Sequence, residues 1–415
     1  MTPRANVFDT LDVILHRRKR KIISQAIAER SMRTFEPIMT EQVDIFVKQL
    51  LMASRTPEPL DMTHQCQNLA GDIVGHLSFG YPLHLQTEDT NRWLLSGLSL
   101  VSAMVNIYMQ LPAFYVMEPA LKFLGRRIRQ KYLQITELMI RSRLAQEKNA
   151  KHDLYSFAID SMGGGNSLKD SELWAEAFFF IVAGGSTTTT AMSALFFYLS
   201  RNPTVYDKLT SEIRSTFQSG AEIQSGSQLQ KCVYLRACIN EVLRMATPNT
   251  ATLWREQSEE ETPETLKPLV IDGCVIPRGT QVGVNLYSLH HNEDYFPDPF
   301  SFRPERWLSS PGYGPDDQAT LLHKAFAPFS VGTRSCPGKA VAFLEITLTL
   351  AKTLWYFDFK TAPGALGQQG AGVHGKKGGR GRQNEYQLYD TFTASHSGPF
   401  LVFQKRDGFG EELET

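Results

Sequence analysis

The amino-acid sequence predicts a mainly α-helical fold with a minor β portion, built as one large domain over residues 1–415. Apolar residues recur at three- and four-residue spacing through most of the first two-thirds of the chain, which is the pattern of amphipathic helices. Short runs rich in β-branched and aromatic residues gather after Pro248. No internal repeat divides the chain, so we expect one unit rather than a repeat array.

The composition excludes several classes of protein. The chain carries 43 basic and 43 acidic residues, so no overall charge favours nucleic acid or anionic membranes. Its 42% hydrophobic and 21% charged content is that of a globular protein with a large core. The cysteines are Cys66, Cys232, Cys238, Cys274 and Cys336, without a CxxC pair. Neither a disulfide scaffold nor a cysteine-rich zinc site is therefore indicated, and a reducing compartment fits.

The expected helices follow one another closely along the chain. In order they cover residues 11–32, 35–51, 60–79, 120–148, 204–217 and 229–245. A glycine run at residues 163–165 marks a loop ahead of a further, much longer helix. The capping-box pattern SLKD starts that helix at Ser167, and Asn202-Pro203 ends it, so we expect it to exceed thirty residues and to cross the whole molecule.

The expected β portion consists of short runs in the last third of the chain. They cover residues 251–256, 269–277, 280–289, 355–360 and 398–404. A Gly- and Lys-rich insert over residues 363–383 separates the last two runs. This insert has too few apolar side chains to pack, so we expect a flexible surface loop.

Two apolar stretches have the length of membrane spans. They cover residues 93–117, which include Asn106, Gln110 and Pro112, and residues 177–199, which include two glycines and four consecutive threonines. Polar groups in the middle of a span are costly in lipid, so we expect both stretches to form buried core helices.

One of the cysteines stands in a constrained pattern. Phe329, Gly332, Arg334, Cys336 and Gly338 form the motif FxxGxRxCxG. A thiolate that binds metal needs shelter from water and backbone N–H groups directed at its sulfur, and glycines allow the tight turn that provides them. Phe329 can shield the sulfur, Gly338 allows a flat cofactor to approach, and Arg334 can reach a cofactor carboxylate. Cys336 is therefore the candidate metal ligand.

This motif resembles the heme-thiolate loop of the cytochrome P450 monooxygenases. The resemblance implies that Cys336 is the axial ligand of the iron of heme b, whose electron donation favours cleavage of the O–O bond. It also implies insertion of one oxygen atom from O2 into a small lipophilic metabolite. Electrons would come from NADPH through a flavoprotein of the NADPH–cytochrome P450 reductase type, and no nucleic acid takes part.

A second motif supports the resemblance. Glu241 and Arg244 lie three residues apart on one expected helix, which is contact distance, although the pair alone is ordinary. The later FRPERW supplies Arg306. Together the three residues resemble the family's ExxR motif with its downstream arginine, which implies a structural triad that holds the fold under the heme.

A third motif lies midway along the longest expected helix, in the sequence AGGSTT. Two glycines there cost about 1 kcal/mol each relative to alanine, which indicates a packing or functional reason. The resemblance implies an oxygen-binding groove, in which Ala183 and Gly184 leave space over the iron and Thr187 directs protons to oxygen. The family usually has an acid immediately before this threonine, where this chain has Ser186, so the relay would run through hydroxyls and water. A packing patch of small residues is the alternative.

The basic segment LHRRKRK offers heme propionate ligands. His16 and Arg20 lie on one helical face, with a spacing that resembles the family's propionate-binding pair. Arg255, in LWRE, resembles another propionate ligand. The remaining charges are expected to form a solvated face or a docking surface for an acidic electron-transfer partner: Arg17, Arg18, Lys19 and Lys21. A nuclear-localisation signal is the alternative for this segment.

Two further patterns carry less weight. GAGVHGKK, at residues 370–377, nearly matches a P-loop, but Lys377 stands where Mg²⁺ binding needs Ser or Thr. His290 and His291 lack HExxH spacing, so we expect a loop pair rather than a zinc site.

The resemblance covers about residues 13–405, with its motifs in the family's order. The sequences of these motifs most resemble those of filamentous-fungal members of the family that act on secondary metabolites. It implies a membrane anchor and a first small β-sheet ahead of Met1, which the chain as written lacks, and location at the cytosolic face of the endoplasmic reticulum for full-length relatives. The substrate lining is expected from residues 93–117, 178–183, 247–253 and 392–397. A heme-thiolate isomerase, dehydratase or peroxygenase, and an inactive shortened member, are the alternatives.

Overall fold

The fold is described from a computed structural model of the chain. It describes residues 5–27, 29–147, 153, 170–257, 268–308, 316–409 and 411–413. The glycine run at 163–165 and the cap expected at Ser167 lie outside these residues.

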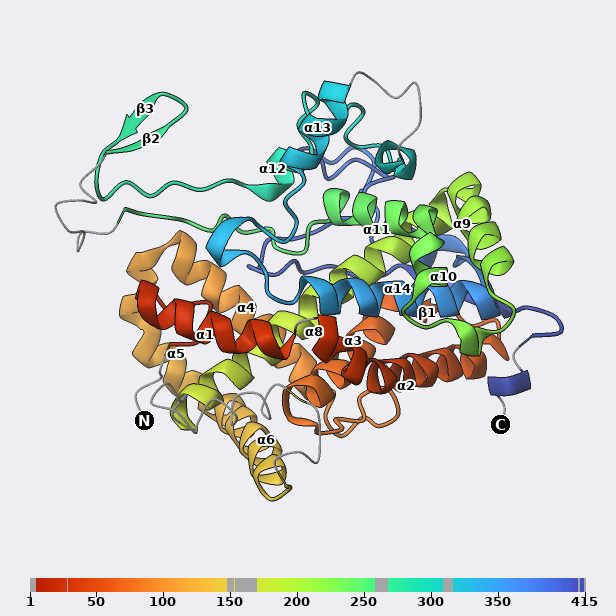
Figure 1. The fold of residues 1–415 in the computed structure, drawn as a ribbon, viewed down its shortest axis with the longest axis horizontal. Helices are drawn as coiled ribbons and strands as arrows, with labels where there is room; N and C mark the ends of the chain where they lie inside the picture. Colours follow the sequence, from red (N-terminus) through yellow and green to blue (C-terminus); the bar gives the residue numbers. More distant parts are fainter. Residues whose placement is uncertain are drawn as a thin grey trace.

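Helices dominate the described chain, which confirms the predicted fold class (Figure 1). The α-helices are α1 (Val13–Ala26), α2 (Glu29–Ser54), α3 (Met62–Phe79), α4 (Trp93–Gln110), α5 (Glu118–Leu124), α6 (Arg126–Leu144), α8 (Asp170–Arg201), α9 (Pro203–Thr216), α10 (Ser227–Lys231), α11 (Val233–Met245), α12 (Leu286–His290), α13 (Asp316–Ala325) and α14 (Lys339–Tyr356).

Helix α8 is the long central helix that the sequence predicts. It has 32 residues, and it ends where Pro203 occupies the first turn of α9 and cannot continue the α8 hydrogen-bond ladder. In Figure 1 it passes behind α1 and α3 through the middle of the molecule. Its second half is buried on every side, with Phe196, Phe197 and Tyr198 at most 1% exposed.

The main core lies between the long helices and the larger sheet. Buried apolar side chains of α2, α3, α8, α11 and α14 form one cluster, for example Leu50, Leu69, Leu195, Val242 and Leu354. Each such side chain stabilises the fold by about 1.5–3 kcal/mol through its removal from water. This cluster provides the rigid frame for the loops that precede and follow α11 and α14.

The strands form two small antiparallel sheets. In the larger, β5 (Phe400–Lys405) pairs with both β1 (Leu60–Asp61) and β4 (Phe357–Thr361), which confirms the last two predicted runs. In the smaller, β2 (Leu269–Ile271) and β3 (Cys274–Ile276) form a hairpin. Its turn is Asp272-Gly273, both at positive φ, as a two-residue hairpin turn requires.

Several predicted boundaries are wrong. The expected helix 11–32 ends at Ala26, and α2 starts at Glu29 and continues through Pro37. The segment 120–148 is divided at Gly125 into α5 and α6. Residues 280–289 do not form a strand: Val282 pairs only with Arg255, and the Asn285 side chain then caps α12.

The predicted burial of residues 93–117 is also wrong. By length and composition two described helices could cross a membrane, α4 and residues 179–201 of α8. The apolar window of α4 is 18% buried and that of α8 is 61% buried, so only α8 is a core helix. Exposed apolar side chains continue beyond α4 through the 3-10 turn Pro112–Met117, where Val116 is 84% exposed.

The Gly- and Lys-rich insert over 363–383 lies at the surface and is hydrogen-bonded. A 3-10 turn covers Gly364–Gln368, and the Gly372 and Val373 N–H groups donate to the Arg382 and Arg380 carbonyls. Several glycines of this segment have positive φ, which allows tight turns. The segment is therefore held by turns and hydrogen bonds rather than by apolar contacts. The flexibility of this loop stays a prediction.

Candidate active site

The loop that carries Cys336 connects α13 to α14. It closes on itself because the Cys336 N–H donates to the Phe329 carbonyl at 2.7 Å and the Ser335 N–H donates to the Gly332 carbonyl at 3.1 Å. Gly332 has φ +75°, a conformation that is unstrained only for glycine. The Phe329 ring packs against Phe343 of α14, with centroids 5.4 Å apart. The motif therefore folds as a tight turn immediately before α14.

Cys336 is a free cysteine and is exposed to solvent. Lost hydration on its packed sides raises the pKa of the thiol, while the Gly338 backbone N–H and the charge of Arg20 lower it. A Cβ at Gly338 would lie 3.8 Å from the Cys336 sulfur, so α14 begins in contact with this sulfur. The thiol is thus accessible to solvent, and the Gly338 N–H and the charge of Arg20 would stabilise its thiolate, as a metal-binding cysteine requires.

Cationic side chains gather beside this loop. The Arg20 guanidinium donates to the Ser335 carbonyl, and Arg334 Nη2 donates to the Thr10 carbonyl at 2.7 Å. His16 is buried, and burial together with the charges of Arg334 and Arg20 lowers its pKa. Burial and the charge of Arg255 lower the pKa of Arg334. The structure thus brings together the four residues that the sequence predicts for heme propionates.

These residues fit a heme. Within the described ranges, no carboxylate forms an ion pair with Arg20, Arg255 or Arg334, so a cluster of like charges faces the loop without an internal anion. Two propionates would supply that anion through charge-assisted hydrogen bonds. No group of three His, Cys, Asp or Glu side chains in the described part of the chain could hold a bare metal ion. Heme would take one protein ligand to its iron here, and the Cys336 thiolate could supply it.

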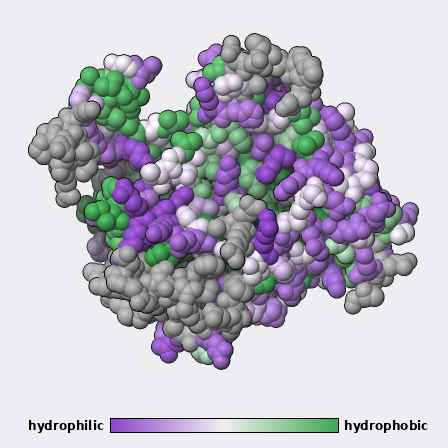
Figure 2. All heavy atoms as spheres, in the orientation of Figure 1, coloured by the Kyte–Doolittle hydropathy of each residue, from purple (hydrophilic) through white to green (hydrophobic). Residues whose placement is uncertain are grey.

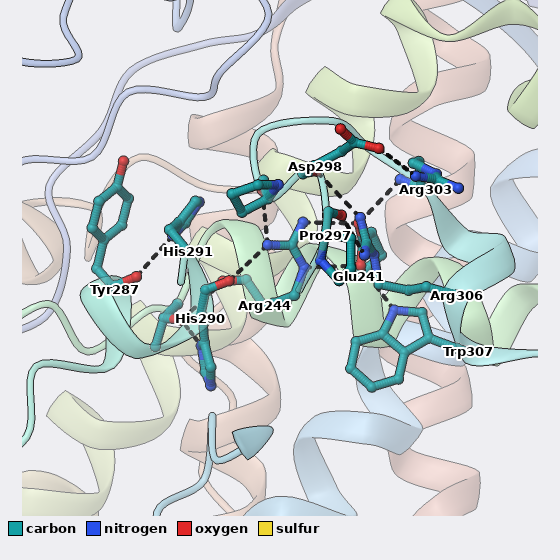
Figure 3. A network of polar contacts seen from close by, with 12 residues as sticks. Glu241, Arg244, Tyr287, His290, His291, Pro297, Asp298, Arg303, Arg306 and Trp307 are labelled. Atoms are coloured by element: carbon teal, nitrogen blue, oxygen red, sulfur yellow. Dashed lines mark hydrogen bonds and ion pairs between the residues drawn. The ribbon is translucent and has the colours of Figure 1, made fainter. Parts of the chain in front are cut away.

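Glu241 is the centre of a buried polar network (Figure 3). Arg244 donates to both carboxylate oxygens at 2.9 and 3.0 Å, and Arg306 Nε donates to Oε1 at 3.0 Å. The Trp307 indole and the Arg303 backbone N–H complete the shell, at 2.9 and 3.0 Å. Burial alone would raise the pKa of Glu241, but Arg244 and then Arg306 outweigh it and hold the pKa below its usual value.

His290 connects this network to the cysteine loop, which sequence reasoning missed. Its carbonyl accepts from Arg244 Nη1 at 2.8 Å. Its ring is fully buried, with Nδ1 2.8 Å from Thr247 Oγ1 and Nε2 accepting from the Ala327 N–H at 3.1 Å. The neutral ring therefore joins the end of α11 to the start of the loop that leads to Cys336. HHNEDYF gives no local sign of this role.

The residues predicted to form the oxygen groove lie on α8, where their hydroxyls form a row. Ser186 Oγ donates to the Val182 carbonyl at 3.0 Å, and Thr187 Oγ1 donates to the Ala183 carbonyl at 2.7 Å. Each hydroxyl still has lone pairs to accept a proton from a neighbour. One turn before this row, α8 packs with α1 and α14 in a cluster that includes Phe180 and Val341. Helix α8 thus meets both the helix of His16 and Arg20 and the helix that follows Cys336.

Gly184 has a packing reason in the structure. A Cβ at this position would lie 2.6 Å from Cγ2 of Val74 on α3. We therefore expect Gly184→Ala to lower the free energy of unfolding by about 1–3 kcal/mol through overpacking, measured by urea denaturation. Gly338→Ala, where the added Cβ makes ordinary contacts, is the control. Equal stability of Gly184→Ala and the parent chain would contradict this account.

The prediction that Lys19 lies on a solvated or docking face is wrong. It is fully buried, and its ammonium lies 2.8 Å from Glu176 of α8 and donates to the Ala5 carbonyl. The pair is buried because α1 packs against α8, a contact between residues far apart in sequence. Arg17 and Lys21 remain exposed. In Figure 2 hydrophilic atoms cover this region of α1.

Comparison with known proteins agrees with the geometry. The Cytochrome P450 family model matches residues 8–368. A cytochrome P450 monooxygenase of Gibberella zeae is 32% identical over 411 residues, which cover 97% of this chain and 92% of that protein. Cytochrome P450 monooxygenase apf8 of Gibberella fujikuroi is 35% identical over 379 residues, 90% of this chain and 100% of that protein. Cytochrome P450 monooxygenase poxM of Penicillium oxalicum is 32% identical, over 97% of this chain and 75% of that protein. The chain therefore belongs to the cytochrome P450 family, and its enzyme class is that of the P450 monooxygenases.

Proposed function

We propose that this chain inserts one oxygen atom from O2 into a small lipophilic metabolite in fungal secondary-metabolite biosynthesis. The observation that carries the proposal is the exposed Cys336 thiol in a closed turn, with Arg20, Arg334 and His16 beside it. Heme bound there would supply the binding and activation of O2. Location at the cytosolic face of the endoplasmic reticulum belongs to the same proposal.

The chain's own residues do the rest. Cys336 would hold the iron, and Arg20, Arg255, Arg334 and His16 would hold and orient the propionates. Thr187, whose Oγ1 donates to the Ala183 carbonyl, would hold a proton there. The buried apolar core beneath the loop excludes water, which strengthens electrostatic interactions inside the site.

Substrate contacts come from segments that the structure brings together. Thr393 Oγ1 lies 3.1 Å from Ser102 Oγ of α4, and the Ala394 N–H donates to the Pro248 carbonyl at 2.8 Å. Asn249 and Thr393 also form a β-bridge. Three of the four segments expected to line the substrate thus meet, and their apolar and small polar side chains suit a lipophilic molecule that carries some oxygen.

Electrons enter from a reductase-type flavoprotein in this proposal. Arg17 and Lys21, on the exposed face of α1, offer charge complementarity to an acidic partner. They are on the same helix as Arg20, which contacts the Cys336 loop, so the docking surface would lie beside the heme.

The test is incorporation of labelled oxygen. The heme-loaded chain is incubated with a panel of lipophilic metabolites, a P450 reductase and NADPH under ¹⁸O2, and products are analysed by mass spectrometry. We expect a product that carries one ¹⁸O atom and is absent without NADPH. Product formation that needs neither reductase nor NADPH would instead favour an isomerase, dehydratase or peroxygenase, the alternative that Ser186 in place of an acid permits.

A further inference from the structure

Three phenylalanine rings from distant segments of the chain meet at the surface. The ring of Phe8 is stacked on that of Phe179, with centroids 5.5 Å apart and an interplanar angle of 19°. The ring of Phe392 is edge-to-face with Phe8, at 5.5 Å and 74°. Phe8 is 42% exposed, so this phenylalanine cluster is open to solvent on one side. Aromatic rings favour stacked and edge-to-face contacts, which an open cluster can also make with a flat ligand.

The phenylalanine cluster adjoins the candidate active site. Phe179 precedes Ala183 by four residues, so both lie on the same face of α8. Ala183 is one of the residues predicted to lie over the iron. Arg334 Nη1, from the loop that carries Cys336, donates to the Phe8 carbonyl at 3.5 Å. A molecule held against these rings would therefore lie beside the predicted position of the heme.

Phe392 has a backbone conformation that an aromatic residue rarely adopts. Its φ is +75°, which is strained for a bulky residue. The Phe392 N–H and the Thr250 hydroxyl both donate to one Asp390 carboxylate oxygen, each at 3.1 Å. The Thr393 hydroxyl donates to Ser102 on α4 at 3.1 Å. Strained residues persist where the surrounding contacts fix them, and they gather at active sites and ligand clamps.

Two asparagines beside this turn have buried amide oxygens without a partner. Asn106 Nδ2 donates to the Asp390 carbonyl at 3.1 Å, which fixes the orientation of this amide because a carbonyl only accepts. Asn249 forms a β-bridge with Thr393. The Oδ1 atoms of this asparagine pair are buried and accept no hydrogen bond from the part of the chain that the structure describes. Buried acceptors are rarely left unpaired, so a hydroxyl or N–H group of a ligand, or an internal water, fits here.

We propose that the phenylalanine cluster and the asparagine pair select a substrate with a flat ring system that carries a hydroxyl or N–H group. The inference rests on the proposed oxygenase function, because it narrows the class of substrate. The rings contact the flat part of the substrate, and the amide oxygens accept from its donor. A puckered ring makes poorer contact with the cluster, and a molecule without a donor leaves the amide oxygens buried and unpaired.

The test is ligand binding to the heme-loaded protein with three probes of similar length. 4-Phenylphenol has two flat rings and a hydroxyl group, 4-cyclohexylphenol has a puckered second ring, and 4-methoxybiphenyl has no hydrogen to donate. Dissociation constants are measured by isothermal titration calorimetry and by the shift of the Soret band. We expect 4-phenylphenol to bind about three- to tenfold more tightly than either of the others. Both others have more apolar surface, so burial alone would favour them.

Each preference has its own variants. Phe8→Leu, at an exposed position, and Phe392→Gly, which relieves the positive φ, should each abolish the preference for 4-phenylphenol over 4-cyclohexylphenol. Asn249→Leu should abolish only the preference over 4-methoxybiphenyl. Phe409→Leu is the matched control, because Phe409 is also exposed and is edge-to-face with Trp355 at 5.5 Å. It should keep both preferences.

The outcomes separate this inference from the function on which it rests. The inference fails if the parent chain binds the three probes alike or binds none of them. It also fails if both preferences persist in the variants while the CO-bound spectrum stays intact, because the rings and amides then only hold the fold. If the parent chain shows both preferences but forms no ¹⁸O-labelled product, the proposed function fails and the recognition site stands.

Discussion

Glu241→Gln is expected to lower the free energy of unfolding by about 3–5 kcal/mol, because it removes the charge that compensates two buried guanidinium groups. Arg244 is fully buried and Arg306 is nearly so, and both lie 2.9–3.0 Å from this carboxylate. The amide would also direct N–H groups at one of these donors. Urea denaturation of the purified protein measures the change.

The matched control is Arg303→Gln, in the same region (Figure 3). The Arg303 side chain forms an exposed pair with Asp298 at 2.7 Å, and exposed pairs contribute about 0–1 kcal/mol. The backbone N–H that Arg303 donates to Glu241 is unchanged by the substitution. If Glu241→Gln costs no more than Arg303→Gln, the network does not hold the fold as described.

Acidification is expected to destabilise the chain through two buried neutral histidines. Burial lowers the pKa of His290 to about 3 and that of His291 to about 4, from an ordinary value near 6.5. A histidine whose pKa is lowered in the folded state does not reduce the free energy of unfolding above about pH 6.5. As the pH falls below that value, the free energy of unfolding decreases, because only the unfolded chain takes up the proton. At pH 5 the unfolded chain binds each proton but the folded chain does not, which costs about 2 kcal/mol for each histidine.

The measurement is the free energy of unfolding at pH 7 and pH 5 for the parent chain and His290→Gln. Glutamine can accept a hydrogen bond from the Ala327 N–H but takes up no proton. The decrease in the free energy of unfolding from pH 7 to pH 5 should therefore be about 2 kcal/mol smaller in His290→Gln than in the parent chain. His64→Gln, at an exposed histidine of α3, should leave the loss unchanged. An unchanged loss in His290→Gln would show that the ring is not the buried neutral group described here.

Local patterns predicted most of the fold, and long-range contacts account for the errors. The long helix α8 and the stops at Gly80 and Pro203 follow from nearby residues, so the sequence contains them. The pairing of Lys19 with Glu176 depends on how α1 packs against α8, which no window of sequence contains. Hydropathy also does not specify which apolar faces of a helix pack against a partner, so α4 was predicted to be buried although only 18% of its apolar window is buried.

In the candidate site, too, short motifs predicted some residues, and long-range contacts determine the others. The Cys336 loop and the Glu241–Arg244 pair lie within short motifs, and their residues meet as the spacing predicts. His290 acts through Thr247 and Ala327, both distant in sequence, so only the structure shows its role.

The central claim, that Cys336 holds the iron of a heme in this chain, is tested most directly by the CO difference spectrum of the reduced protein. The parent chain, purified with heme, is compared with Cys336→Ala and with Cys66→Ala, which removes a buried cysteine away from the loop. We predict the long-wavelength Soret band of thiolate-ligated ferrous heme in the parent chain and in Cys66→Ala, and its loss in Cys336→Ala. A parent chain that binds no heme, or a long-wavelength band that persists in Cys336→Ala, would contradict the claim.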